Sequence, residues 1–418
     1  MSGGERTSRL ELAAAALAAL ALCLGSPARA EPIHGRIEVQ DTAAFAREDS
    51  LDAALGARNR NDLAADLRLT WEPSWDRWSF SVHYNASASY GDSARLARAR
   101  GPLTAPPATL VDLEDTFADD GHLTGSHRID RLALTYSTAE TVVRVGRQAL
   151  TWGSGLVFRP MDLFNPFSPT ATDTEYKPGV DMIYVQRLFA DGSDVQLIVV
   201  PRPPRRGARA SSDASSAAAH LHTTIAGRRT TWLLARDHGD WVAAVGVNGA
   251  LGGATWNLEV VPTFLDGGGT RVSGLANISY SATLMRRNAT LFAEYFHNGF
   301  GARERNFDVA SLPPELLDRL SRGQLFSTRR NYLSAGMTLE VNPLLNAGPT
   351  VIANLDDGSV LLLASATVSL GDNLTLVAGA QAPIGGHRTE FGGLPLAPAS
   401  QTFVAPPARL YLQLRRYF

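Results

Sequence analysis

The feature that most constrains the fold is a strict alternation of apolar and polar residues. In residues 78–90 every second position is Trp, Phe, Val, Tyr or Ala, and the positions between them are Ser, His or Asn. This period of two places the apolar side chains on one face of a β-strand and the polar ones on the other. Residues 63–71 alternate in the same way, and only the segment 72–76 separates the two runs. Together they predict a β-hairpin.

The same alternation recurs along most of the chain. We predict about 18 strands, and because an antiparallel sheet that closes on itself has an even number of strands, 16 is the nearest alternative. The least regular runs are the first, the eighth and the fifteenth. The predicted strands are residues 33–45, 62–71, 77–90, 129–136, 141–150, 178–189, 194–202, 219–226, 229–237, 240–250, 253–264, 270–281, 289–298, 330–341, 349–355, 359–370, 374–383 and 403–418.

The connections between the predicted strands differ on the two sides of the sheet. One set is tight, such as residues 371–373, whereas the other set includes long segments such as 91–127 and 151–178. A soluble β-sandwich could also alternate, but short periplasmic turns and longer external loops are typical of outer-membrane β-barrels. Every strand edge must be paired in lipid, so we expect the first strand to pair with the last. The sequence therefore predicts an all-β fold, a transmembrane antiparallel β-barrel, over residues 31–418.

Residues 1–30 have the features of a secretory signal peptide. Arg6 and Arg9 precede an Ala- and Leu-rich run, and small residues at positions 28 and 30 predict cleavage after Ala30. The single cysteine, Cys23, lies in this run, and Leu22 before it makes a lipoprotein site the weaker alternative. Removal of this segment leaves no thiol, which excludes a disulfide framework, a thiolate metal site and a cysteine nucleophile.

Charge and motif content exclude several other classes of protein. The formal net charge is −2 and the basic residues are scattered, so we expect no nucleic-acid partner. No apolar run approaches the ~18–20 residues that a membrane-spanning helix needs. The sequence pairs no serine or aspartate with a histidine, so we predict no enzymatic activity, no catalytic residue and no cofactor. A TonB-dependent transporter would need a plug domain and about 22 strands.

One segment departs from the alternation and organises the rest. Residues 144–169 run from a short strand into a loop rich in Gly, Pro, Arg and aromatic residues. A long apolar loop normally folds back onto the protein, because its aromatic side chains would otherwise lie in water. We therefore predict that residues 151–178 enter the barrel and narrow its lumen, with Trp152, Phe158 and Phe164 anchoring the loop. The alternative is a loop that only seals the inner wall.

The polar faces of the predicted strands and this loop supply candidate pore-lining residues. Both signs of charge occur, so no strong ion selectivity follows. Metal ligands are not assigned, although the acidic segment 112–120 leaves Ca²⁺ binding open beside a solvated loop. The predicted lining or constriction residues are Arg144, Arg147, Gln148, Arg159, Asp162, Asp181, Glu259 and Glu294.

A short motif adds a resemblance to a known group of proteins. Arg144 to Gln148 read RVGRQ, Trp-Gly follows at 152–153, and DLFNP occupies 162–166. This GRQ…WG…DLFNP pattern resembles proteobacterial outer-membrane porin-like barrels and is loosely similar to alginate-export-type barrels, which implies a passive outer-membrane conduit. The terminal Phe418 resembles the C-terminal aromatic residue of barrels, which implies recognition by the barrel-assembly machinery.

These observations predict a porin-like channel in the outer membrane of a Gram-negative bacterium. It would pass small solutes, lie among outer-membrane lipid and lipopolysaccharide, and be narrowed by the loop near 151–178. The alternative is a non-conducting barrel, either a structural or adhesion scaffold or the outer-membrane partner of an export system.

Overall fold

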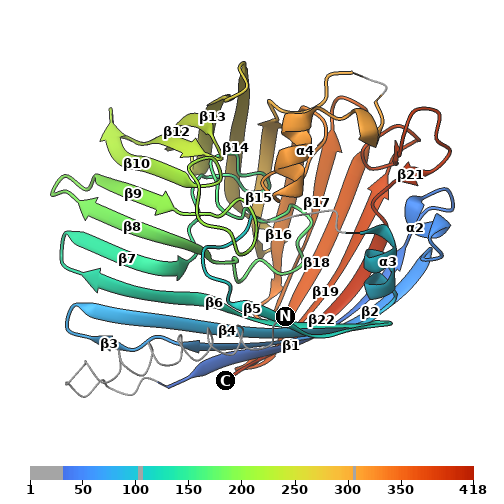
Figure 1. The fold of residues 1–418 in the computed structure, drawn as a ribbon, viewed down its shortest axis with the longest axis horizontal. Helices are drawn as coiled ribbons and strands as arrows, with labels where there is room; N and C mark the ends of the chain where they lie inside the picture. The colour runs from blue at the N-terminus through green and yellow to red at the C-terminus, as the bar shows by residue number, and fades with distance from the viewer. Residues whose placement is uncertain (1–31, 102–106, 305–306) are drawn as a thin grey trace.

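The computed structural model describes residues 32–101, 107–304 and 307–418, and the predicted signal peptide lies outside them. One sheet of 20 strands dominates the fold (Figure 1). Two of them, β3 (Ser74–Trp75) and β5 (Glu114–Asp120), are short additions. The wall strands are β1 (His34–Phe45), β2 (Asn59–Trp71), β4 (Trp78–Gly91), β6 (Leu123–Ser137), β7 (Thr141–Gln148), β8 (Val180–Leu188), β9 (Asp194–Val200), β10 (Ser216–Ile225), β11 (Arg228–Asp237), β12 (Asp240–Leu251), β13 (Ala254–Phe264), β14 (Thr270–Leu284), β15 (Arg287–His297), β16 (Asn331–Asn342), β17 (Leu345–Asn354), β18 (Val360–Gly371), β19 (Leu374–Ile384) and β22 (Ala408–Tyr417).

The wall closes on itself as an antiparallel barrel of 18 strands. Strand β1 pairs with β22 from Arg36 opposite Tyr417 to Phe45 opposite Ala408. The last residue also takes part, because the backbone N–H of Gly35 donates to the carbonyl of Phe418 at 2.8 Å. Closure leaves no open edge in the wall, which is the condition for a sheet to span lipid. The predicted fold class and strand number are confirmed.

The alternation in the sequence becomes two faces of the wall. In β22 the outward Leu410, Leu412 and Leu414 are about half exposed, whereas Gln413 between them is fully buried. An apolar outer band of this extent would be unfavourable in water but suits a bilayer. Within the described parts of the chain, none of the helices is long and apolar enough to cross a membrane.

Tight turns join the strands at the end predicted to face the periplasm. Residues 226–227 and 285–286 both have positive φ angles, 50° and 72° for the first turn and 49° and 64° for the second. Two consecutive positive φ angles define the type I′ turn, whose twist matches that of a β-hairpin. The long loops lie at the other end, together with α2 (Leu51–Ala54), α3 (Asp92–Arg100), η1 (Val309–Ser311), α4 (Pro314–Ser321), β20 (Leu394–Pro395) and β21 (Phe403–Val404).

The sequence did not predict β5, which completes the wall beside β6. Strand β4 pairs along nearly the whole of β6 on one edge. On the other edge β7 pairs with residues 132–137 only, and β5 pairs with residues 123–128. Because the chain leaves the wall after Gln148, β5 satisfies backbone groups of β6 that β7 does not reach. The predicted fourth strand therefore begins earlier, at Leu123, and the predicted last strand begins later, at Ala408.

Candidate functional site

The segment between β7 and β8, residues 149–179, is the lumen loop of this barrel. It follows the inward course that the sequence predicted, because its side chains and backbone contact inward-facing residues of strands on opposite sides of the wall. Its first half contacts β9, β10 and β13–β16, and its second half contacts β19, β22, β1, β2 and β6.

Trp152 anchors the beginning of the loop. Its ring stacks on the imidazole of His220 with centroids 4.7 Å apart and planes only 4° from parallel. Its indole Nε1–H donates to the side-chain oxygen of Gln196 at 3.0 Å, so the polar edge of the ring is also satisfied. Phe164 packs edge-on against the same indole at 5.5 Å and is fully buried. Trp152 and Phe164 therefore belong to one apolar cluster on the inner wall.

The carboxylate of Glu294 holds the middle of the loop. It accepts hydrogen bonds from three consecutive backbone N–H groups, those of Leu156 at 2.6 Å, Val157 at 3.0 Å and Phe158 at 2.8 Å. Asn277 of β14 adds a fourth at 3.1 Å through its amide nitrogen. Bonds to an ionised acceptor are stronger than those between neutral groups. This side chain, 1% exposed, thus binds the loop rather than facing open lumen.

Glu259 of β13 makes a similar contact one step earlier in the loop. Its Oε1 accepts a hydrogen bond from the backbone N–H of Ser154, whose carbonyl in turn accepts one from Asn277 at 2.9 Å. Gly153 has a φ of +89° and lies directly against this carboxylate, where a β-carbon would come within 3.2 Å of Oε1. Glycine suits both the positive φ and the close approach.

Phe158 packs on the neighbouring strands. Its ring stacks on Phe296 of β15 at 4.5 Å and tilts against Tyr332 of β16 at 5.3 Å. These three rings belong to a second apolar cluster, separate from the one around Trp152. The three predicted anchoring residues, Trp152, Phe158 and Phe164, are thus all buried against the wall or the loop itself.

A buried ion pair closes the loop on itself. The Nζ of Lys177, the only lysine in the sequence, donates to both carboxylate oxygens of Asp162 at 2.6 and 2.7 Å. It also donates to the carbonyl of Leu150 and to Oγ1 of Thr151 at 3.3 Å, so it ties the start of the loop to its end. The compact ammonium can serve such converging acceptors better than a planar guanidinium. Burial raises the pKa of Asp162 to about 6 and lowers the pKa of Lys177, because it disfavours both charged forms.

The returning half of the loop binds the seam where the barrel closes. Arg36 of β1 donates to Asp173 and to Glu175, each at 2.8 Å. Tyr417 of β22 donates its hydroxyl to the same Glu175 at 2.9 Å. The ring of Tyr176 lies 5.0 Å from the guanidinium of Arg36, within the range of a cation–π contact.

The remaining predicted lining residues fall into two groups. Arg144 faces inward and donates to Oγ1 of Thr135 at 2.9 Å, and Arg159 donates to the carbonyl of Gly155 at 3.3 Å. Neither guanidinium forms an ion pair within the described residues, and both are partly exposed. Gln148 is also inward, but it is buried and bonds the carbonyl of Met182 at 3.3 Å.

Arg147 and Asp181 lie on the other face of the wall. They are register partners on β7 and β8, two positions beyond the outward pair Val145 and Ile183. Residues two apart on a strand share a face, so this ion pair, at 2.8 Å, points away from the lumen. Backbone groups of Val111 cover it, donating to Asp181 and accepting from Arg147.

Sequence reasoning missed several partners of the loop. His220, Gln196 and Asn277 each contact it, yet nothing in their local sequence distinguishes them from other inward polar residues. The acidic segment 112–120 is partly paired, because Asp112 takes two hydrogen bonds from Arg206 at 2.5 and 2.6 Å. Within the described ranges, no cluster of three or more His, Cys, Asp or Glu is arranged to hold a metal ion.

The comparisons with known proteins support the fold. No protein-family model and no curated protein sequence matches the chain. Among solved structures, OccAB2 of Acinetobacter baumannii matches with a TM-score of 0.54 at 11% identity, covering 94% of this chain and 99% of that one. OccK5 (OpdH) of Pseudomonas aeruginosa matches at 0.52 and 11%, covering 92% and 98%. Wzi of Escherichia coli, described as a carbohydrate-binding β-barrel involved in group 1 capsule assembly, matches at 0.53 and 7%, covering 96% and 87%.

This chain has the fold of outer-membrane porins. The matches cover nearly the full length of both partners, so the resemblance includes the whole barrel and not one hairpin. The motif and the alginate-export likeness remain sequence predictions.

Proposed function

We propose that the protein is an outer-membrane channel for passive passage of small solutes, with the lumen loop as its constriction. The observation that carries this proposal is that the carboxylate of Glu294 accepts hydrogen bonds from three consecutive backbone N–H groups of the loop. A loop held this way in mid-lumen narrows a barrel that, at 18 strands, is wide enough for an aqueous path.

The partly exposed guanidinium groups support a role in lining the path. Arg144 on β7 and Arg159 in the loop make hydrogen bonds to neutral oxygens and no ion pair among the described residues. An Arg without a carboxylate partner keeps its charge available to solutes. Glu259, Glu294 and Asp162 instead hold the loop in place. The ion pair of Arg147 and Asp181 stabilises the outward face of the wall where β7 ends.

Planar-bilayer conductance of the purified barrel tests this function. We expect discrete channels whose conductance rises when residues 152–167 are deleted. Channels that the deletion leaves unchanged would contradict the constriction, and the absence of channels from both proteins would contradict a conduit.

The alternative is a non-conducting barrel that serves as a scaffold or as the partner of an export system. It is favoured by the continuous contact of the loop around the wall, and by the similarity to Wzi, which is a carbohydrate-binding barrel. In that case the wild-type protein conducts no current in the bilayer, whereas the variant without residues 152–167 conducts.

The setting of the channel follows from the same proposal. The outward apolar band would contact outer-membrane lipid and lipopolysaccharide, and the C-terminal strand ending at Phe418 would bind the barrel-assembly machinery. Residues 1–30 would direct export across the inner membrane. We propose no enzymatic activity and no nucleic-acid partner.

A further inference from the structure

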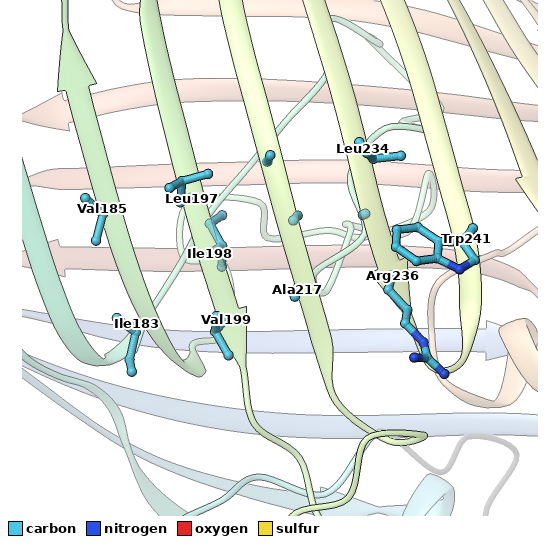
Figure 2. A pocket seen from close by; sticks show the side chains of 12 residues that line it. Ile183, Val185, Leu197, Ile198, Val199, Ala217, Leu234, Arg236 and Trp241 are labelled. Carbon is cyan, nitrogen blue, oxygen red and sulfur yellow. The ribbon is translucent and has the colours of Figure 1, made fainter.

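The outward wall carries a groove that a channel does not need. Two hollows of about 380 and 460 Å³ adjoin on β8–β13 and share Ala219 and Leu234. Figure 2 shows the side chains around the first hollow projecting from neighbouring strands, with Leu197 and Val199 on one side and Leu234 and Trp241 on the other.

The strand register explains why the wall is hollow here. On β10, Ala217 lies between Val199 of β9 and Arg236 of β11. Two residues further, Ala219 lies between Leu197 and Leu234. Because these two alanine side chains are smaller than their neighbours on β9 and β11, the outward surface has a groove along β10.

Larger residues close the groove toward the middle of the wall. Leu221 follows on β10, and its register partner Trp232 on β11 is 45% exposed on the same face. The groove therefore begins at the end of the strands that carries the long loops. It extends along β10 from Ala217 to Leu221, which is roughly 13 Å at the rise of a β-strand.

A cation stands at the open end of this groove. Arg236 is exposed, is the register partner of the outward Trp241, and extends beside it in Figure 2. No hydrogen bond or ion pair joins Arg236 to any part of the chain that the structure describes. Tryptophan at such a position typically marks the level of lipid head groups.

An apolar groove that ends at a free guanidinium matches a lipid with an anionic head group. A guanidinium can bind phosphate through two parallel hydrogen bonds. An acyl chain in the groove gains van der Waals contacts, but bulk lipid is equally apolar, so the phosphate must supply most of the preference. We propose that β9–β12 bind one phosphorylated glycolipid of the outer leaflet, of the lipid A type, with its phosphate on Arg236 and an acyl chain over Ala217 and Ala219.

Native mass spectrometry of the detergent-solubilised barrel, titrated with purified lipid A, tests this site. We expect one tightly bound lipid on the wild-type protein. Arg236→Gln removes the phosphate contact and Ala219→Leu fills the groove, and each should weaken binding by at least about tenfold. Lipid A stripped of its phosphates should bind the wild-type barrel as weakly as intact lipid A binds the Arg236→Gln variant.

Arg228→Gln is the matched control. Arg228 is the outward arginine at the opposite end of the same strand, 5.0 Å from the ring of Trp256, and its loss should leave lipid binding unchanged. Equal binding by Arg236→Gln and Arg228→Gln, or equal binding of intact and dephosphorylated lipid, would overturn the proposal. The folded state of each variant is checked first by its heat-dependent mobility in gels, so a loss of lipid binding is distinguished from misfolding.

Discussion

The backbone N–H of Phe158 donates a 2.8 Å hydrogen bond to the carboxylate of Glu294, 136 residues later in the chain. This bond and its neighbours join the lumen loop to the far side of the barrel from β7. Within the loop, the segment 156–158 is therefore held by one buried side chain.

Glu294→Ala should release the loop. The change removes four hydrogen bonds to an ionised acceptor, each worth about 1.5–3 kcal/mol, and leaves three backbone N–H groups unpaired. We expect a larger and noisier single-channel current. Glu340→Ala is the control, because within the described residues this carboxylate accepts a side-chain hydrogen bond only from Asn288, near the opposite end of the barrel. A similar change in current in this variant would contradict a specific role of Glu294.

The single lysine makes loop release measurable by chemistry. The side chain of Lys177 is 5% exposed, so an amine-reactive ester should modify it slowly in the wild-type barrel. Glu294→Ala should speed modification at position 177 by at least about tenfold, as expected from a loss of 1.4 kcal/mol or more. Peptide mass spectrometry separates this site from the terminal amine. Equal rates in both proteins would show that Glu294 does not hold the loop closed.

Acidification should favour the seated loop. The pKa of Asp162 is about 6 in the seated loop against an ordinary 3.8, so the seated state binds the proton more tightly than a released, solvated loop does. The contribution of Asp162 to the stability of the seated loop is therefore complete below about pH 4 and is lost as the pH rises through about 6. Conductance should fall between pH 7 and pH 4.5. Asp162→Asn should weaken this dependence, and a rise in conductance of the wild-type protein on acidification would contradict the prediction.

Trp152→Ala should loosen the first half of the loop without unfolding the wall. Loss of a buried Trp costs about 3–5 kcal/mol, and it removes the ring that stacks on His220 and the indole N–H that donates to Gln196. Hydrogen exchange should lose protection in residues 149–179 while the strands remain protected. Trp241→Ala removes an outward, half-exposed ring and should change neither.

Arg159→Gln should change ion selectivity. If its guanidinium lines the constriction, its removal lowers the local positive potential and shifts the reversal potential in a salt gradient toward cations. Arg187→Gln, which removes an exposed arginine paired with Glu140 on the outward face near the short turns, supplies the comparison. The same shift in both variants would place Arg159 outside the conducting path.

The alternation of residues was sufficient to predict the wall. Most wall strands were predicted close to their observed positions, because an environment with lipid on one face and the lumen on the other imposes a period of two on every strand. Strand β5 was missed because its sequence, EDTFADD, has almost no apolar face. The start of β6 was missed because a register irregularity opposite His83 and Tyr84 interrupts its alternation.

The candidate site was less predictable than the wall. The aromatic loop and its inward course follow from composition, since Trp152 and Phe158 need a dry surface. Which wall residues meet the loop depends on how the barrel is staggered, and local sequence does not encode this. Glu294 therefore looked like any other inward carboxylate, and Arg147, assigned to the lumen, is the last outward residue of β7.

Glu175 accepts hydrogen bonds from both Arg36 of β1 and Tyr417 of β22, the first and last strands of the wall. Before these strands meet, Glu175 has no complete docking place. This contact of the second half of the loop is therefore complete only when β1 and β22 are paired. The same carboxylate thus links the lumen loop to both strands of the seam where the barrel closes.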